Sequence, residues 1–393
     1  MPMVAVILAG GKGTRLAPVT NFLPKALVPI NGLPILKHQI DQLQRIGFSK
    51  VIVLTGYLSS SIENFCKIHS GELEVTCIET NLDWTPADRI LDSEFIIGEE
   101  FLLIYCDNYV TNDADLKSIL MSNSEITFLI EPRNNGNIEL DMNGRAYYLA
   151  GARKESHKYV ELGNIYVKSE NFFDVLRNTR DLPKTLELFS QKTRCNYKIA
   201  TEPIVSLSNF ENYRKLLINR KIIILDRDGI LLEKMPARKY LTKFRDYVPI
   251  YDNWSVLREI SQLGIDFIVA TNQPGVATGQ VSEVFLQQLH TKLMSELTSY
   301  GINVLSIYVC KHHWDEECNC RKPKPGMLIE AMKKFGIHST ETLYIGDEEK
   351  DLIAATAAGI DYVIINREVE SEFVFTDLLT AKATILAKIF KIG

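Results

Sequence analysis

The chain has 393 residues, with 46% hydrophobic and 24% charged side chains and a formal net charge of −5. This composition is that of an average globular protein, and the length suits two domains better than one. The acidic balance argues against a large basic surface for nucleic acid, and no apolar stretch approaches the ~20 residues needed to span a bilayer.

The first part of the chain alternates apolar strands with amphipathic helices. Residues 3–9 form a continuous apolar run that ends in glycines, and without a basic leader this run indicates a buried strand rather than a signal peptide. We then expect a helix over 34–47, strands over 50–55, 72–79 and 101–106, helices over 59–69 and near 183–192, and a closing helix over 208–220. This order indicates parallel strands covered on both faces by helices.

The alternation restarts at residue 221. We expect strands over 221–225, 265–270, 303–309, 341–345 and 361–365, with helices near 254–264, 281–299, 325–335 and 349–358. No repeat relates the two series. The sequence therefore predicts two doubly wound, Rossmann-like α/β domains over 1–218 and 219–393, the first with a mixed sheet and the second with a parallel sheet.

Polar side chains follow four strands of the second domain, at the points where the strands end. Asp226 and Asp228 come directly after the strand at 221–225, and two carboxylates this close need a cation or a proton between them. Because ligands bind at the carboxyl ends of strands in an open α/β sheet, we expect these groups to converge. The other polar groups at strand ends are Thr271, Asn272, Arg321, Lys322, Lys324, Asp347 and Asp351.

This set resembles the four signature motifs of the haloacid dehalogenase-like phosphohydrolases, over residues 220–366. The resemblance implies a covalent phosphoaspartyl route, in which Asp226 attacks phosphorus and Asp228 protonates the leaving oxygen and later activates water. Thr271 and Lys322 would hold the phosphoryl oxygens as charge develops. The implied magnesium ligands are Asp226, Asp347 and the backbone carbonyl of Asp228, with Asp351 as an orienting neighbour.

Residues 310–326 read CKHHWDEECNCRKPKPG, and they hold three of the seven cysteines. Cys310, His312, Cys318 and Cys320 have the pattern C-x-H-x5-C-x-C, which suits a tetrahedral structural zinc ion, with His313 as the competing histidine. The alternative is a redox pair, but a Cys-x-Cys disulfide would close a strained ring. A nucleic-acid-binding finger would need a recognition helix and a basic surface. The scattered Cys66, Cys77, Cys106 and Cys195 are expected to be buried thiols in a reducing, cytoplasmic setting.

A zinc loop that ends in CRKP resembles one subgroup of this family, the heptose bisphosphate and histidinol phosphate phosphatases. In that subgroup the loop shapes the substrate pocket, and Arg321 and Lys322 meet the substrate phosphate. The expected further substrate contacts are Asn272, Gln273 and Arg238. The x5 spacing is similar to the histidinol branch, whereas RKPKPGM, TNQPGVATG and KMPARKYL are similar to the heptose branch. Glu348 stands where the heptose enzymes carry a lysine, and its carboxylate would repel a phosphate unless it turns away.

The first domain opens with a glycine-rich loop, LAGGKGTRL at residues 8–16. Glycines let the backbone approach an anion, although the loop has neither the Walker pattern nor the dinucleotide pattern. Together with LPKALVPINGLPIL (23–36), the loop resembles the opening of the sugar-1-phosphate nucleotidyltransferases. The resemblance implies a nucleoside triphosphate on the loop, Arg15 and Lys25 screening its phosphates, and Asp107 as a magnesium ligand. The expected nucleotide contacts are Leu8, Ala9, Gly10, Gly11, Gly13, Thr14, Arg15 and Lys25.

Two segments depart from that family. Residues 82–90 (LDWTPADRI) lack the glycines of its nucleotide-binding segment, and Ser206 replaces an aspartate that supplies a second metal ligand. Losing one of two carboxylates would weaken magnesium binding, because hard cations need charged oxygen ligands. ELGNIYV (161–167) is still similar to the family's sugar-contacting strand.

The two resemblances together imply a bifunctional enzyme that removes a phosphate from heptose 1,7-bisphosphate and then transfers a nucleotide, GTP being favoured, to heptose 1-phosphate for surface polysaccharide. An alternative keeps only a phosphatase, acting on histidinol phosphate or another small ester, with a non-catalytic nucleotide-binding or assembly domain before it. Expected partners are sugar phosphates and a nucleoside triphosphate, without nucleic acid or membrane. Homo-oligomerisation stays open.

Overall fold

The computed structural model describes residues 3–142, 145–151, 155–192, 195–217, 220–237, 239–366 and 374–391. Contacts between residues divide the chain into two compact units, Met1–Thr20 with Pro24–Val28 and Pro34–Tyr213, and Asn21–Leu23 with Pro29–Leu33 and Arg214–Gly393. Residues 218 and 219, where the sequence predicts the domain boundary, lie outside the described residues. None of the helices described combines the length and the apolar character needed to cross a membrane.

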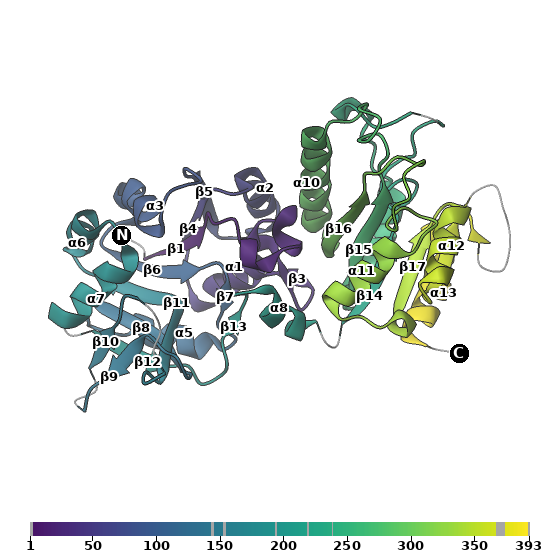
Figure 1. Ribbon diagram of the computed structural model, residues 1–393. Coiled ribbons are helices and arrows are strands. Elements are labelled where there is room, and N and C mark those ends of the chain that lie inside the picture. Colours follow the sequence, from purple (N-terminus) through teal and green to yellow (C-terminus); the bar gives the residue numbers. More distant parts are fainter. Residues whose placement is uncertain are drawn as a thin grey trace. The chain divides into compact units, whose positions relative to one another are not determined.

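A mixed sheet of nine described strands forms the centre of the first unit (Figure 1). Its order is β10-β9-β11-β6-β1-β4-β5, with β8 pairing β11 and β12. Strand β1 runs parallel to β4 and β6, whereas β11 runs antiparallel to β6 and β8. The strands are β1 (Val4–Ala9), β4 (Lys50–Thr55), β5 (Glu74–Glu79), β6 (Glu100–Tyr105), β8 (Ile126–Pro132), β9 (Ile138–Leu140), β10 (Ala146–Tyr148), β11 (Tyr159–Lys168) and β12 (Asn196–Ile199).

Helices and short strands complete this part of the chain. Helix α1 ends at Gly47, whose φ of 100° is a left-handed conformation that suits glycine. Helix α3 begins with a capping box between Thr85 and Asp88 and with Pro86 in its first turn. The helices are α1 (Ile35–Ile46), α2 (Ser59–His69), α3 (Pro86–Asp92), α4 (Glu94–Ile97), α5 (Asp113–Leu120), α6 (Phe172–Thr179), α7 (Leu182–Lys192) and α8 (Phe210–Leu216), and the short strands are β2 (Pro29–Ile30), β3 (Leu33–Pro34), β7 (Asn108–Tyr109) and β13 (Val205–Ser206).

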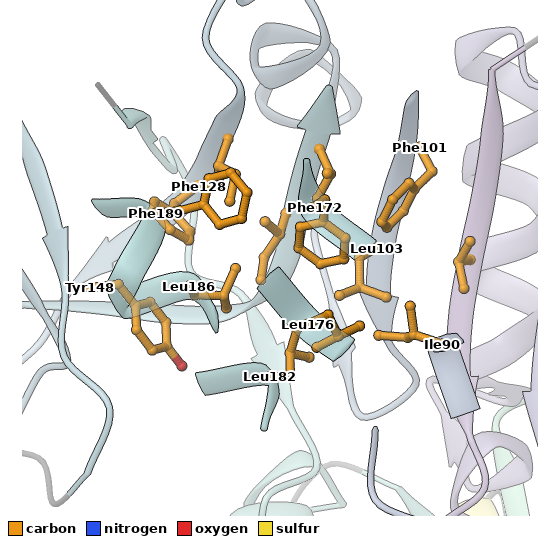
Figure 2. Packing of buried hydrophobic residues seen from close by; sticks show 14 of the residues in the cluster. Ile90, Phe101, Leu103, Phe128, Tyr148, Phe172, Leu176, Leu182, Leu186 and Phe189 are labelled. Atoms are coloured by element: carbon orange, nitrogen blue, oxygen red, sulfur yellow. The ribbon is translucent and has the colours of Figure 1, made fainter. Parts of the chain in front are cut away.

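The core of the first unit lies between the sheet and α3, α6 and α7. Phe101 and Phe172 meet edge to face with ring centroids 5.5 Å apart, and Phe128 stacks on Tyr148 at 5.7 Å (Figure 2). Such aromatic contacts add to the free energy gained by removing apolar area from water. Val4 and Val6 of β1, the strand that leads into the glycine loop, belong to this core.

A parallel sheet of six described strands, in the order β16-β15-β14-β17-β18-β19, forms the second unit. Helix α9 contacts α10 and α13, while α11 and α12 contact strands of the sheet. The elements are β14 (Lys221–Leu225), α9 (Tyr251–Gln262), β15 (Ile265–Asn272), α10 (Glu283–Tyr300), β16 (Val304–Cys310), α11 (Gly326–Phe335), β17 (Thr342–Gly346), α12 (Glu349–Ala357), β18 (Asp361–Ile365), β19 (Val374–Phe375) and α13 (Leu378–Phe390).

The predicted fold class is confirmed: a mixed sheet precedes a parallel sheet, with helices on both. Two elements of the second unit were not predicted. Strand β19 has only two residues, which is too short for a periodic pattern. Helix α13 buries residues 378, 381, 385 and 389, a helical spacing that the sequence does carry.

Candidate active sites

Parallel strands bring the predicted polar groups of the second unit to one edge of the sheet. Strand β14 lies between β15 and β17, so Asp226 and Asp347, which follow β14 and β17, lie near Thr271 in the last two residues of β15. A pocket at this edge is lined by residues from all three strand ends and by residues 234–237 and 239–241. The predicted catalytic groups that line it are Asp226, Asp228 and Thr271.

Lys322 lies buried beneath this pocket. Its Nζ is 2.9 Å from Oδ2 of Asp226, 2.7 Å from Oδ1 of Asp351 and 2.9 Å from the hydroxyl of Tyr344. Asp351 also accepts hydrogen bonds from the backbone N–H groups of Asp347 and Glu348, each at 3.2 Å. Because the oxygens of Asp351 are occupied in this way, its side chain holds Lys322 and the start of α12 in place.

Asp228 is held by donors on two sides. Arg227 reaches its two oxygens from Nε at 3.0 Å and Nη2 at 2.9 Å, and Gln273 donates to Oδ2 at 2.9 Å. Gln273 also donates to the hydroxyl of Thr271 at 2.9 Å, which links two of the predicted catalytic groups. The carboxylate of Asp228 is thus restrained toward the pocket.

Arg227 is a residue that the sequence analysis missed. It is 2% exposed, and its Nη1 lies 3.1 Å from Nε2 of His290. Burial and the charge of Arg227 lower the pKa of His290 well below its usual value, so the ring accepts this hydrogen bond as neutral imidazole. An arginine between two strand-end aspartates was visible in the sequence, but its partner on α10 was not.

Asn272 connects the end of β15 to the loop that carries Lys322. Its amide nitrogen donates to the carbonyl of Lys322 at 2.9 Å, and its amide oxygen accepts from the N–H of Lys322 at 3.1 Å. The amide group of Asn272 therefore binds the backbone of Lys322, and Asn272, Gln273 and Arg321 all line the pocket. Arg238, the remaining predicted substrate contact, lies outside the described residues.

The acids at the strand ends form a group that fits a divalent cation. One oxygen from each of Asp226, Asp347 and Asp351 lies within 4.8 Å of the others. Burial and the neighbouring carboxylates raise the pKa of Asp226 to about 7 against the opposing effect of Lys322, and burial also raises the pKa of Asp347. Among the described groups, Oδ1 of Asp347 is buried with no hydrogen-bond partner. An orphaned carboxylate oxygen beside crowded acids is what Mg2+ satisfies.

Gly229 allows this arrangement. A Cβ atom at this position would overlap the carboxylate of Asp347, and its φ of 84° is a left-handed conformation that other residues rarely adopt. The glycine after Asp228 is therefore required by the close approach of Asp347.

The carboxylate of Glu348 forms ion pairs with two lysines. Its two oxygens contact the ammonium groups of Lys234 and Lys350, and Lys234 also lies 2.9 Å from Oδ2 of Asp347. Burial alone would raise the pKa of Glu348, but these hydrogen bonds lower it to about 2. Two lysines therefore compensate the carboxylate that we expected to repel a phosphate.

The four predicted zinc ligands converge in one place. The Sγ atoms of Cys310 and Cys318 lie 3.8 Å apart, and Nδ1 of His312 lies 3.6 Å from Sγ of Cys310 and 3.1 Å from that of Cys320. Sulfur ligands at ~2.3 Å from a tetrahedral zinc ion are separated by about 3.8 Å. The competing His313 instead stacks on Trp314 with ring centroids 3.8 Å apart. The residues present fit zinc.

The glycine loop of the first unit follows β1 and leads into a short helix over Thr14–Leu16. Gly13 has a left-handed φ of 63°, and Gly11, Thr14 and Arg15 are exposed. Leu8 and Ala9 belong to β1 itself. Lys25 lies 2.5 Å from Oδ2 of Asp107, so two of the predicted groups form an ion pair.

Arg89 was also missed by the sequence analysis. Its side chain, 4% exposed, donates to the carbonyls of Thr55 and Leu82 at 3.0 and 3.2 Å and contacts the hydroxyl of Thr80. A Cβ atom at Gly10 would overlap the guanidinium. Gly10 thus leaves room for Arg89, which comes from the segment that lacks the expected glycines. The Thr85-Pro-Ala-Asp88 capping signal could have predicted the helix that carries it.

Ser206 lies on a strand that pairs with the segment directly after Asp107. Strand β13 pairs with β7, with Ser206 opposite Asn108, and the N–H of Leu207 donates to the carbonyl of Asp107 at 2.7 Å. The position at which the resemblance implies a second acidic ligand is therefore in register with the residue after Asp107, and it holds a hydroxyl.

Two family models match the chain, "Nucleotidyl transferase" over residues 4–145 and "Haloacid dehalogenase-like hydrolase" over residues 207–365. The chain is also 33% identical over 148 residues to the D-glycero-beta-D-manno-heptose-1,7-bisphosphate 7-phosphatase of Pseudomonas aeruginosa, a match that covers 38% of this chain and 82% of that protein. The chain belongs to the haloacid dehalogenase-like hydrolases. It is an enzyme that joins such a phosphatase domain to a nucleotidyl transferase domain, and phosphatases of this family use Mg2+.

Parts of the chain are also similar to solved structures. One is the D,D-heptose 1,7-bisphosphate phosphatase of B. bronchiseptica, complexed with magnesium and phosphate. It is 27% identical to this chain, with a TM-score of 0.39, and the match covers 43% of this chain and 99% of the phosphatase. HddC from Yersinia pseudotuberculosis is 21% identical and covers 55% of this chain and 98% of its own, with a TM-score of 0.45.

Proposed function

We propose that the C-terminal domain hydrolyses a phosphate ester of a heptose bisphosphate and that the N-terminal domain transfers a nucleotide to the heptose 1-phosphate that remains. The observation that carries the first half is the buried contact of Lys322 with Asp226, whose side chain lines the pocket. The relatives' activity on heptose 1,7-bisphosphate supports the choice of sugar.

In the phosphatase domain, a carboxylate oxygen of Asp226 forms a bond to phosphorus while the bond to the sugar oxygen breaks. Asp228, held by Arg227 and Gln273, gives a proton to that leaving oxygen. Lys322 and Thr271 stabilise the charge on the phosphoryl oxygens. Asp228 then takes a proton from water, which attacks the phosphoaspartate and releases phosphate with Asp226 restored. Magnesium held by Asp226, Asp347 and the Asp228 carbonyl would supply positive charge to the phosphate.

Zinc on the four-ligand loop would act as a structural ion. The loop runs directly into Arg321, which lines the pocket, and Lys322, which contacts Asp226, so ordering the loop fixes both side chains. In the nucleotidyl transferase domain, Lys25 and Arg15 would screen the triphosphate, and Asp107 would bind Mg2+ while the sugar phosphate attacks the α-phosphorus and pyrophosphate leaves.

A second candidate function keeps the phosphatase and makes the first domain a non-catalytic nucleotide-binding or assembly module. Two observations favour it. Arg89 fills the space against Gly10, and Ser206, opposite Asn108, is an uncharged residue where the resemblance implies an aspartate.

Phosphorus NMR distinguishes the two functions. The full-length protein is mixed with Mg2+, D-glycero-D-manno-heptose 1,7-bisphosphate and GTP, with Asp226→Asn as the matched control. Free phosphate followed by pyrophosphate and a sugar diphosphonucleoside supports the bifunctional enzyme. Phosphate alone supports the second candidate, and hydrolysis that survives in Asp226→Asn rejects the covalent route.

A further inference from the structure

The phosphatase pocket contains cations that the proposed phosphoryl transfer does not use. The reacting phosphate is served by Lys322, whose side chain is fully buried beside Asp226. Lys234, Arg321 and Lys350 line the same pocket, and the two lysine side chains are 45% and 35% exposed. The pocket thus has one cation at its floor and a separate group toward solvent.

Glu348 holds two of these outer cations together. One of its oxygens contacts Nζ of Lys234 and the other contacts Nζ of Lys350. Lys234 comes from the loop that follows β14, whereas Glu348 and Lys350 stand at the start of α12. The ion pair therefore fixes that loop over the pocket and keeps the ammonium of Lys234 at its lining.

The charges of this group do not cancel. Lys234 and Lys350 carry two positive charges against the single negative charge of Glu348, and Arg321 adds another positive charge. Asp347, which contacts Lys234 at 2.9 Å, belongs to the acids that fit a divalent cation, and a bound cation would compete for that carboxylate. A partly exposed lysine whose positive charge is not fully compensated can bind a phosphate dianion.

We propose that Lys234, positioned by Glu348, binds the second phosphate of the substrate and makes the pocket selective for a sugar bisphosphate over the corresponding monophosphate. This inference rests on the proposed phosphatase function. The ammonium of Lys234 donates to the phosphate that is not cleaved, so it contributes to substrate binding rather than to bond breaking. Glu348 acts through Lys234 by restricting where its flexible side chain lies.

The test compares KM and kcat for D-glycero-D-manno-heptose 1,7-bisphosphate and heptose 7-phosphate in full-length protein with Mg2+. Lys234→Met should raise KM for the bisphosphate about 10- to 100-fold with kcat little changed, and should change KM for the monophosphate less than about 3-fold. Glu348→Gln should raise KM for the bisphosphate by a smaller factor. Lys382→Met, which removes an exposed lysine paired with Glu259 away from the pocket, should leave both substrates unaffected.

Equal losses for both substrates, or no loss for either, would overturn the role of Lys234 while leaving the phosphatase function standing. A wild-type protein that hydrolyses neither substrate would instead reject the proposed function. The role of Lys234 is then decided by calorimetric titration of the bisphosphate into Asp226→Asn, with lysine or methionine at position 234. A Kd that rises about 10-fold or more with methionine supports it, and equal Kd values reject it.

Discussion

The Nζ of Lys322 lies 2.9 Å from Oδ2 of Asp226, and both side chains are buried. The same ammonium binds Asp351 at 2.7 Å, so one cation compensates two carboxylates. Removing one partner of a buried ion pair leaves an uncompensated charge in a poorly solvated place.

Lys322→Met should therefore lower the free energy of unfolding by about 3–5 kcal/mol and reduce phosphatase kcat at least about 100-fold. Urea unfolding and phosphate release measure the two effects. Lys333→Met, on the exposed face of α11, is the matched control and should change neither. Unaltered stability in Lys322→Met would contradict the buried pairing.

The raised pKa of Asp226 predicts a pH dependence of stability without Mg2+. Burial and the neighbouring acids raise this pKa to about 7, against about 3.9 for an unfolded aspartate. Between these pH values the carboxyl group of Asp226 binds a proton more tightly in the folded state than in the unfolded state. The stability that this proton contributes is therefore complete below about pH 4 and is lost as pH rises through 7. Tm of Asp226→Asn, which cannot ionise, should rise relative to wild type between pH 5 and 8. Parallel curves of Tm against pH for the two proteins would contradict this prediction. Added Mg2+ should reduce the difference in Tm between them.

The zinc loop predicts a specific metal content. Elemental analysis should find one zinc ion per chain in the wild type and a loss of zinc in Cys318→Ser, together with lower phosphatase activity because Arg321 and Lys322 follow the loop. Cys77→Ser, on β5 of the other unit, is the control that should keep its zinc. A folded wild-type protein without zinc would refute the assignment.

Ser206→Asp tests whether the nucleotidyl transferase domain lacks only a metal ligand. A carboxylate at position 206, which pairs with Asn108 directly after Asp107, would add charged oxygen for Mg2+, so release of pyrophosphate should increase about 10-fold or more. Ser208→Asp adds the same charge two residues further along and should not. If both variants release pyrophosphate at the wild-type rate, a missing carboxylate ligand for Mg2+ does not limit nucleotidyl transfer.

The position of Arg89 predicts that Gly10 and Gly11 differ in how well they tolerate substitution by alanine. Gly10→Ala should cost about 1–3 kcal/mol of unfolding free energy because the new Cβ would overlap the guanidinium. Gly11→Ala should stay within about 0.5 kcal/mol, since its Cβ would have no described atom within 4 Å. In an Arg89→Ala background the cost of Gly10→Ala should shrink, and an undiminished cost would place the strain elsewhere.

The sequence alone determined the features that depend on local pattern. Strands such as Lys221–Leu225 are continuous apolar runs, and their ends are marked by Asp226 and by Asp347 after β17. Strand-end position suffices to predict that these groups meet, because parallel strands share one carboxyl edge. The convergence of the four candidate zinc ligands was equally predictable, since all four lie between residues 310 and 320.

Only the tertiary structure decided which distant side chains neutralise one another. The negative charge of Glu348 is compensated by Lys234, which comes from another loop. The segment at 82–90, which lacks the expected glycines, contributes to a helix whose Arg89 packs against Gly10. Arg227 likewise finds its buried partner on α10. Charge pairing depends on distances of a few ångströms between segments far apart in the chain, and no periodicity or motif in the sequence records those distances.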